Sequence, residues 1–203
     1  MNSVAAVVAY FIGAIPTASL LARSRGIDLR SEGSGNPGTN NALRIGGPVL
    51  ALSVLCVEAA KGYVAVSAGS AIADEWGATI GGVAAVAGNV FNIWYRFSGG
   101  KGLGISLGVL MAAWPWVLPG LVTLIAVTAL VTRSAGLAAL TAMASLLIAA
   151  LVWPIQDWST GGLVESGPGL VVLATGMTAI MGWKHWRDSP LNSAWRSVQR
   201  TPA

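Results

Sequence analysis

Charged residues are scarce in this chain of 203 residues, so most of what a soluble protein needs on its surface is missing. Only 10% of the residues are Asp, Glu, Lys or Arg, whereas 54% are hydrophobic and the mean hydropathy is +0.67. A domain of this size does not expose such a composition to water. A soluble globular fold is therefore excluded, and the chain is predicted to lie in a lipid bilayer.

Residues that commonly hold metals or disulfides are also scarce. The chain has one cysteine, Cys56, within an apolar run, and one histidine, His185. No zinc-ligand cluster, Walker loop, nucleophile elbow or dinucleotide fingerprint occurs, so the sequence predicts no metal site and no cofactor. The net charge of +4 does not indicate nucleic-acid binding, because the basic residues stand between apolar runs and form no soluble basic surface.

Long apolar runs are what the sequence has in abundance. Crossing a bilayer core takes ~20 apolar helical residues, and seven runs are candidates: 3–22, 48–72, 77–95, 103–116, 117–132, 135–155 and 168–183. The fourth and fifth are short and could be broken at Pro115 or Pro119, which leaves a five-span alternative open. We expect an all-α integral membrane protein of about seven transmembrane helices. Residues 1–203 would form one polytopic domain, with a short cytoplasmic tail from about residue 184.

The charges alternate between the loops in a way that predicts orientation. If the N-terminus lies outside, the inner segments hold nearly all basic residues: Arg23, Arg25, Arg30, Arg44, Arg96, Lys101, Arg133, Lys184, Arg187, Arg196 and Arg200. The outer loops hold Asp74, Glu75, Asp157 and Glu165. Cytoplasmic loops of membrane proteins are enriched in Lys and Arg. The N-terminus is therefore predicted outside and the C-terminus in the cytoplasm.

Two glycine-rich segments on the inner side are candidate anion sites. The first combines small residues, a hydroxyl and amides with a guanidinium, namely Gly33, Ser34, Gly35, Asn36, Gly38, Thr39, Asn40, Asn41 and Arg44. The second surrounds one lysine with glycines: Gly99, Gly100, Lys101 and Gly102. Backbone amides, side-chain donors and cations without steric bulk suit phosphate. The alternatives are an ordinary glycine-rich turn for the first segment and a basic membrane anchor for the second.

Two further polar groups stand at or inside predicted spans. His185 and Asp188 are three residues apart at the inner end of the last span, so on a continuing helix they share a face and could bind one substrate together. Glu58 and Lys61 are three residues apart inside the second span. Charges there are costly, so we expect the two to neutralise each other; a transport pathway is the alternative.

The order of these motifs resembles the bacterial acyl-phosphate:glycerol-3-phosphate acyltransferase family over nearly the whole chain. Besides the two glycine-rich segments, the resemblance includes Gly13 to Pro16, Ile27 to Arg30, and the acidic-x-x-Lys-Gly pattern from Glu58 to Gly62. It implies a seven-helix enzyme of the bacterial inner membrane that acts in phospholipid synthesis. Such an enzyme moves a fatty acyl group from acyl phosphate to glycerol 3-phosphate, yielding lysophosphatidic acid, without metal, cofactor or acyl carrier protein.

The resemblance also assigns roles to residues. Ser34, Asn36, Arg44 and Lys101 would hold the phosphates, and His185 would correspond to the family's C-terminal substrate-binding histidine. These positions, with the neighbouring loop residues, form the expected site. We expect Lys101, Arg44, Ser34 and His185 to act in catalysis. The expected substrate contacts are Gly35, Asn36, Gly38, Asn40, Asn41, Gly99, Gly100, Gly102, Ser134 and Asp188.

Several positions depart from the family pattern. Where the family has Gly-His-x-Phe-Pro, this chain has Asn89 and Asn92 in place of the histidine and proline. Asn40 replaces a threonine, and Gly136 stands where the family carries a serine, with Ser134 the nearby hydroxyl. A carboxylate, Asp188, replaces an amide and would meet a phosphate of like charge. The departures leave open a catalytically impaired or retuned member that binds lipid or a polyol phosphate, beside a small transporter. The oligomeric state is not predicted.

Overall fold

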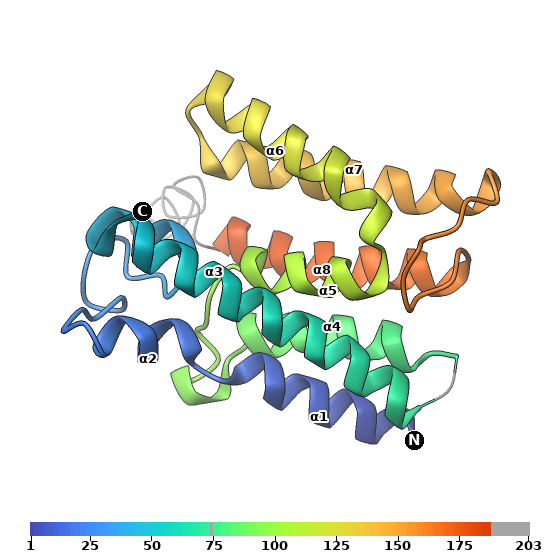
Figure 1. Ribbon diagram of the computed structural model, residues 1–203, viewed down its shortest axis with the longest axis horizontal. Helices are drawn as coiled ribbons and strands as arrows, with labels where there is room; N and C mark the ends of the chain where they lie inside the picture. Colours follow the sequence, from blue (N-terminus) through green and yellow to red (C-terminus); the bar gives the residue numbers. More distant parts are fainter. Residues whose placement is uncertain (74, 188–203) are drawn as a thin grey trace, which may run out of the picture.

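A computed structural model of the chain describes residues 1–73 and 75–187. All regular secondary structure in these two ranges is helical (Figure 1). The elements are α1 (Asn2–Ala14), α2 (Thr17–Arg23), α3 (Thr39–Ile72), α4 (Gly77–Val90), η1 (Ile93–Tyr95), α5 (Leu103–Ala113), η2 (Pro115–Val117), α6 (Leu118–Thr132), α7 (Ala135–Ile155) and α8 (Pro168–Arg187).

Each of the seven predicted runs contains a helix, although prolines and glycines divide some of them. The first run is broken at Pro16, which has no N–H to donate and precedes the first residue of α2. The fourth and fifth runs are separated by a turn at Pro115, one of the two predicted breaks. Within the described ranges, four stretches are long and apolar enough to cross a membrane: Asn2–Arg23, Thr39–Ile72, Pro115–Thr132 and Ala135–Ile155.

Helix α3 begins earlier than predicted. The sequence indicated a loop as far as Arg44 and a helix from residue 48, but α3 starts at Thr39 and bends at Gly47, which has a φ of 76° and precedes Pro48. Glycine accepts this positive φ without a Cβ clash, and because the conformation is not helical, residues 39–46 and 48–72 are two helical pieces joined by a kink. As a result, Asn40, Asn41 and Arg44 lie on the first turns of a helix and have a fixed spacing.

The last helix is also longer than predicted. The expected tail began near residue 184, but α8 continues to Arg187, so Lys184 and His185 are helical. Basic residues in the last turn of a helix interact favourably with its dipole. The expected cytoplasmic tail from about residue 184 stays a prediction, its first residues being helical, and Asp188 lies outside the described residues.

Glycines bring the helices close together. Gly62 on α3 and Gly108 on α5 face each other's helix, and a methyl group on Gly108 would overlap the backbone of Ala59. Small residues let membrane helices approach until their backbones touch. Helices α1, α3, α4, α5 and α8 form one packed group, against which the α6–α7 pair lies on one side (Figure 1).

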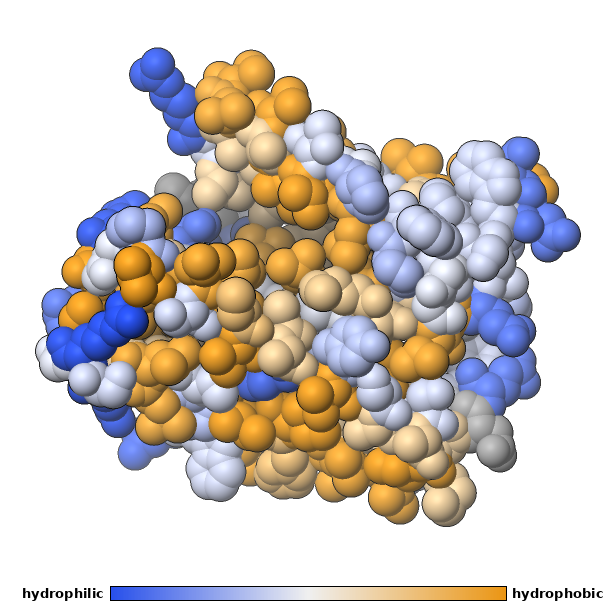
Figure 2. Space-filling view, in the orientation of Figure 1, coloured by the Kyte–Doolittle hydropathy of each residue, from blue (hydrophilic) through white to orange (hydrophobic). Residues whose placement is uncertain are grey.

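The surface is divided into a broad apolar belt and two polar ends (Figure 2). Large apolar side chains point outward from the helices, among them Leu130 and Val131, each 78% exposed. Such a surface is stable against lipid and not against water. The basic loops between α2 and α3 and between α4 and α5 lie together at one end, opposite the N-terminus (Figure 1). These two loops, which the charge pattern placed on the same side, do lie together, and the orientation in the membrane stays a prediction.

Candidate active site

A cavity of about 570 Å³ opens at the basic end, between α3, α5 and α6. Figure 2 shows the surface hollowed between α3 and α6. Its polar lining combines most of the predicted anion-binding residues with groups from α3 and α4: Ser34, Asn36, Gly38, Thr39, Asn40, Asn41, Arg44, Glu58, Asn89, Gly100, Lys101 and Gly102. The two glycine-rich segments, about 60 residues apart in sequence, thus contribute to one site.

Two helices begin at this cavity. The N-cap residues of α3 and α5 are Gly38 and Gly102, neither of which has a side chain to cap the helix. The first-turn N–H groups of both helices are left for another acceptor, and the helix dipole adds partial positive charge there. With Arg44 and Lys101 beside them, these N–H groups suit anionic oxygens. The site thus brings together two sets of donors for anionic oxygens, one at each helix N-terminus.

The three glycines of the second segment have two different structural roles. Gly102 has a φ of 83°, which admits a glycine but strains other residues, and it turns the chain into α5. The N–H groups of Gly99 and Gly100 donate to the carbonyl oxygens of Val90 (2.9 Å) and Asn89 (3.2 Å). The expectation that these two amides are exposed to an anion is therefore wrong. They bind the C-terminal turn of α4, and the available amides are those of α5.

Asn41 holds the first glycine-rich segment in shape. Its Oδ1 accepts from the N–H of Ser34 at 2.8 Å, and its Nδ2 donates to the carbonyl oxygens of Leu29 (2.9 Å) and Glu32 (3.0 Å). The side chain is 2% exposed. Both ends of this amide are committed to the loop, so Asn41 positions Ser34 at the cavity.

A second set of contacts joins the two glycine-rich segments. Arg30 donates to the carbonyl oxygen of Ser98 at 3.1 Å and lies over the Tyr95 ring, 4.2 Å from its centroid. Arg187 from α8 donates to Oγ of the same serine at 3.4 Å. Arg30 lies in the loop before the first segment, and its guanidinium is both hydrogen-bonded to and stacked on the residues before the second segment, which ties the two together. Arg44 on α3 and Lys101 in the loop before α5 therefore belong to segments that are tied together.

The expected ion pair forms at the inner wall of the cavity. Nζ of Lys61 lies 2.9 Å from Oε1 of Glu58, and both residues are 6% exposed. Oε1 also accepts from the Thr17 hydroxyl at 2.7 Å, and Lys61 donates to the carbonyl oxygen of Ile15 at 2.8 Å. Mutual neutralisation is thus confirmed. The network spans the break between α1 and α2, where the carbonyl oxygen of Ile15 accepts from both the N–H of Thr17 (2.9 Å) and Lys61.

Four predicted site residues lie elsewhere. Gly35 is in the loop with its N–H donating to Glu32, and Gly99 packs against α4. Ser134 is the N-cap of α7, where its Oγ accepts from the N–H of Leu137 at 3.2 Å. His185 contacts the carbonyl oxygen of Met181 through Nδ1 at 2.9 Å, one turn back along α8. None of the four lines the cavity in the described part of the chain.

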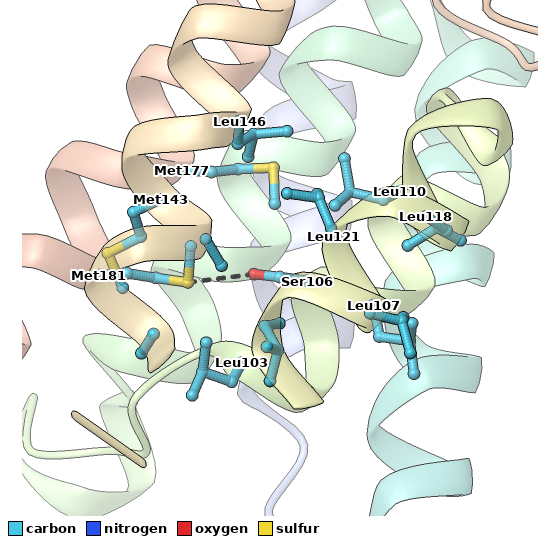
Figure 3. A pocket seen from close by; sticks show the side chains of 14 residues that line it. Leu103, Ser106, Leu107, Leu110, Leu118, Leu121, Met143, Leu146, Met177 and Met181 are labelled. Carbon is cyan, nitrogen blue, oxygen red and sulfur yellow. Dashed lines mark hydrogen bonds between the residues drawn. The ribbon is translucent and has the colours of Figure 1, made fainter. Parts of the chain in front are cut away.

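The cavity continues into an apolar region between the helices. Its lipid side is lined by Leu55, Leu103, Leu107, Val122, Ile125 and Ala126. A second, narrower pocket of about 80 Å³ shares four of these residues and extends among α5, α6, α7 and α8. Leucine and methionine side chains point into it, and the Ser106 hydroxyl donates to Sδ of Met181 at 3.2 Å (Figure 3). The site therefore joins a cationic end to an apolar extension.

Two cavity residues were not predicted as part of the site. The sequence analysis interpreted Glu58 as one partner of an ion pair, but Glu58 also lines the cavity. A carboxylate inside a membrane span already indicates a polar cavity nearby. Asn89 was noted only as a replacement for a histidine. Its Nδ2 donates to Oε2 of Glu58 at 2.7 Å. The nearby Asn92, which replaces a proline, donates to the carbonyl oxygen of Ala14 at 2.7 Å and accepts from the N–H of Trp94.

Comparisons with known proteins agree with this geometry. Residues 3–190 match the glycerol-3-phosphate acyltransferase family. A protein of that name from Brucella anthropi is 42% identical over 184 residues, covering 89% of this chain and 84% of the relative. One from Agrobacterium fabrum is 35% identical over 184 residues, covering 90% and 84% respectively.

The fold is similar to that of a solved membrane enzyme. The crystal structure of PlsY, an integral membrane glycerol 3-phosphate acyltransferase, in its glycerol 3-phosphate form superposes with a TM-score of 0.78. The two are 27% identical, with 97% of this chain and 92% of PlsY covered. The lysophosphatidic acid form of PlsY gives a TM-score of 0.77, with 99% and 94% covered. This chain therefore belongs to the glycerol-3-phosphate acyltransferase family and is a multi-pass protein of the bacterial cell membrane.

Proposed function

We propose that the chain transfers a fatty acyl group from acyl phosphate to glycerol 3-phosphate, forming lysophosphatidic acid and inorganic phosphate. The observation that carries the proposal is one cavity in which two uncapped helix N-termini, Arg44 and Lys101 face an apolar extension. Both substrates are phosphates, and only the donor carries a long chain. A cationic end joined to an apolar groove matches that pair of substrates.

Positioning and charge account for the reaction. The hydroxyl oxygen of glycerol 3-phosphate attacks the acyl carbonyl carbon, the bond from that carbon to the phosphate oxygen breaks, and the departing phosphate takes up the hydroxyl proton. Arg44, Lys101 and the first-turn amides offset the negative charge that develops on the departing phosphate, a role that typically lowers the barrier most. Holding both substrates in one cavity supplies the remaining advantage. No covalent enzyme intermediate is required.

The acyl chain of the donor would occupy the apolar extension. Leu55 on α3, Leu107 on α5 and Ile125 on α6 line the passage from the cations toward lipid. The chain would enter sideways from the bilayer and reach the methionine-lined pocket of Figure 3. Apolar lining removes the chain from water while leaving its phosphate at the polar end.

The reaction would take place at the cytoplasmic face. The basic end of the bundle contains Arg44 and Lys101, and cytoplasmic segments are the ones enriched in basic residues. This orientation puts the N-terminus outside, the C-terminus in the cytoplasm, and the cavity in reach of water-soluble glycerol 3-phosphate. Residues of α3, α4, α5 and α6 line this one cavity, which supports treating the chain as a single domain.

The test is product formation by purified protein in detergent or lipid. Palmitoyl phosphate and radiolabelled glycerol 3-phosphate should give lysophosphatidic acid and phosphate in equal amounts, while palmitoyl-coenzyme A and palmitoyl acyl carrier protein should give none. Turnover with a thioester donor and none with acyl phosphate would overturn the proposed donor. No product from any donor, from protein shown to be folded, would overturn the activity.

A further inference from the structure

Asn89 is placed where the phosphate-binding part of the cavity meets its buried wall. It lies on the last turn of α4, lines the cavity together with Glu58 and Gly100, and is partly buried. A methyl group on Gly100 would lie 3.1 Å from Oδ1 of Asn89, so the glycine leaves the space in front of that oxygen open. The loop beside Lys101 therefore gives a ligand access to the Asn89 amide.

The contact with Glu58 fixes which end of this amide faces the cavity. Oε2 of Glu58 lies 2.7 Å from the Asn89 amide group, and an ionised carboxylate only accepts hydrogen bonds. The nitrogen of Asn89 must therefore point at Glu58. Its oxygen then points away from Glu58, and among the described residues no protein group donates to it.

Glu58 is itself held in place, so it fixes the amide firmly. Oε1 accepts from Thr17 at 2.7 Å and from Lys61 at 2.9 Å, and the side chain is nearly fully buried. These partners lie on α2 and α3, while Asn89 lies on α4. Rotation of the carboxylate would break bonds to both neighbours. The orientation of Asn89 is consequently set by three helices.

The charged side chains and helix N-termini of this cavity other than Glu58 donate hydrogen bonds, so a substrate hydroxyl needs a different kind of partner. Arg44, Lys101 and the first-turn amides of α3 and α5 suit phosphate oxygens. Glycerol 3-phosphate has two hydroxyls, and the attacking one directs its proton to the departing phosphate. The hydroxyl on carbon 2 takes no part in the transfer, and its hydrogen needs an acceptor when it leaves water.

We infer that Oδ1 of Asn89 binds the carbon-2 hydroxyl of the acceptor and that Glu58 is a positioning residue that holds this oxygen toward the substrate. The inference rests on the proposed function and adds a basis for acceptor choice. The site selects a phosphorylated vicinal diol over a phosphate with a single hydroxyl, because the latter leaves Oδ1 without a donor.

The test compares glycerol 3-phosphate with 3-hydroxypropyl phosphate, which keeps the attacking hydroxyl and lacks the one on carbon 2. The measured quantity is the ratio of kcat/KM for the two acceptors, with palmitoyl phosphate as donor. We expect about a 10-fold preference for glycerol 3-phosphate in the wild type, the size of one hydrogen bond between uncharged groups. Asn89→Leu should bring the ratio close to one, whereas Asn40→Ala, at the phosphate end, should lower both rates and keep the ratio.

Two rescue variants separate hydrogen bonding from shape. Asn89→His should retain the preference, because a neutral imidazole donates to Glu58 from one nitrogen and accepts from the other. Glu58→Gln should abolish it, since the new amide donates to Asn89 and turns its oxygen away from the cavity. Combining Glu58→Gln with Asn89→Asp should restore the preference, because the aspartate accepts from Gln and still presents an oxygen.

Failure of the inference and failure of the proposed function give different results when each rate is divided by the amount of folded protein. A wild-type ratio near one, or an Asn89→Leu variant that lowers both rates in proportion, would overturn the inference and leave the proposed function intact. If Asn89→Leu does not fold, loss of the preference in Glu58→Gln and its return in the double variant decide the question. Absence of product from the wild type would instead refute the proposed function.

Discussion

Replacing Lys61 with methionine is the sharpest test of the buried network. Methionine keeps the length of the side chain and removes its charge, which leaves the carboxyl group of Glu58, 6% exposed, with only Thr17 and Asn89 as donors. The carbonyl oxygen of Ile15 also loses its 2.8 Å bond. Removing one partner of a buried ion pair destabilises a protein by ~3–5 kcal/mol, because the other charge remains without compensation.

That free energy corresponds to a measurable change in melting temperature. For a chain of this length ~1 kcal/mol shifts Tm by about 2–4 °C, so Lys61→Met should lower Tm by about 10 °C. Thermal stability in detergent is best followed by tryptophan fluorescence, since nine tryptophans are present. A thiol-reactive dye would be misleading, because the single cysteine, Cys56, is already exposed.

The double variant supplies the control. Glu58→Gln with Lys61→Met removes both charges, and replacing a whole buried ion pair is typically neutral or stabilising. The double variant should therefore melt at a higher temperature than Lys61→Met alone. Equal melting temperatures for Lys61→Met and the wild type would refute the reasoning, since they would mean that Glu58 reaches water without its partner.

Three further predictions concern packing, the phosphate loop and the acyl groove. Gly108→Ala should lower Tm or prevent folding, because its methyl group overlaps the α3 backbone, whereas Gly120→Ala on α6 should be tolerated because nothing lies within 4 Å. Asn41→Ala removes three hydrogen bonds that shape the first glycine-rich segment, so it should raise KM for glycerol 3-phosphate and speed limited proteolysis of residues 30–38. Ala142→Phe should fill the methionine-lined pocket and slow the transfer of palmitoyl groups more than that of octanoyl groups. Leu140 is half-exposed, so Leu140→Phe is the control. Equal effects of Ala142→Phe on both donors would contradict the proposed path of the acyl chain.

The sequence predicted the arrangement of helices because that arrangement follows from local composition. Apolar runs of near-spanning length specify membrane helices wherever they occur, and Arg23 to Arg44 stand at the same end as Arg96 and Lys101 because of how the spans alternate. The break at Pro115 was also predictable, since proline lacks the N–H that a continuous helix needs.

What the sequence missed depended on contacts between distant residues. The glycine-rich pattern around Asn41 suggested a loop, yet residues 39–46 form a helical piece that begins at Thr39 and ends at the kink at Gly47. The amides of Gly99 and Gly100 were assigned to an anion because nothing local shows that the carbonyls of α4 accept them. Asn89 was seen as a departure, and its role becomes visible only beside Glu58, 31 residues away.

The central claim is that Arg44 and Lys101 hold phosphate at the reaction centre. It is tested most directly by acyl transfer from palmitoyl phosphate to glycerol 3-phosphate in Lys101→Ala, with Arg25→Ala as a matched control. Arg25 is an exposed cation in the neighbouring loop that does not line the cavity. Both variants should reach the membrane in wild-type amounts. The account predicts that Arg25→Ala keeps wild-type turnover. It predicts that the turnover rate of Lys101→Ala falls at least about 100-fold, the effect of removing one donor that stabilises charge in a transition state. Wild-type turnover in Lys101→Ala would contradict the account.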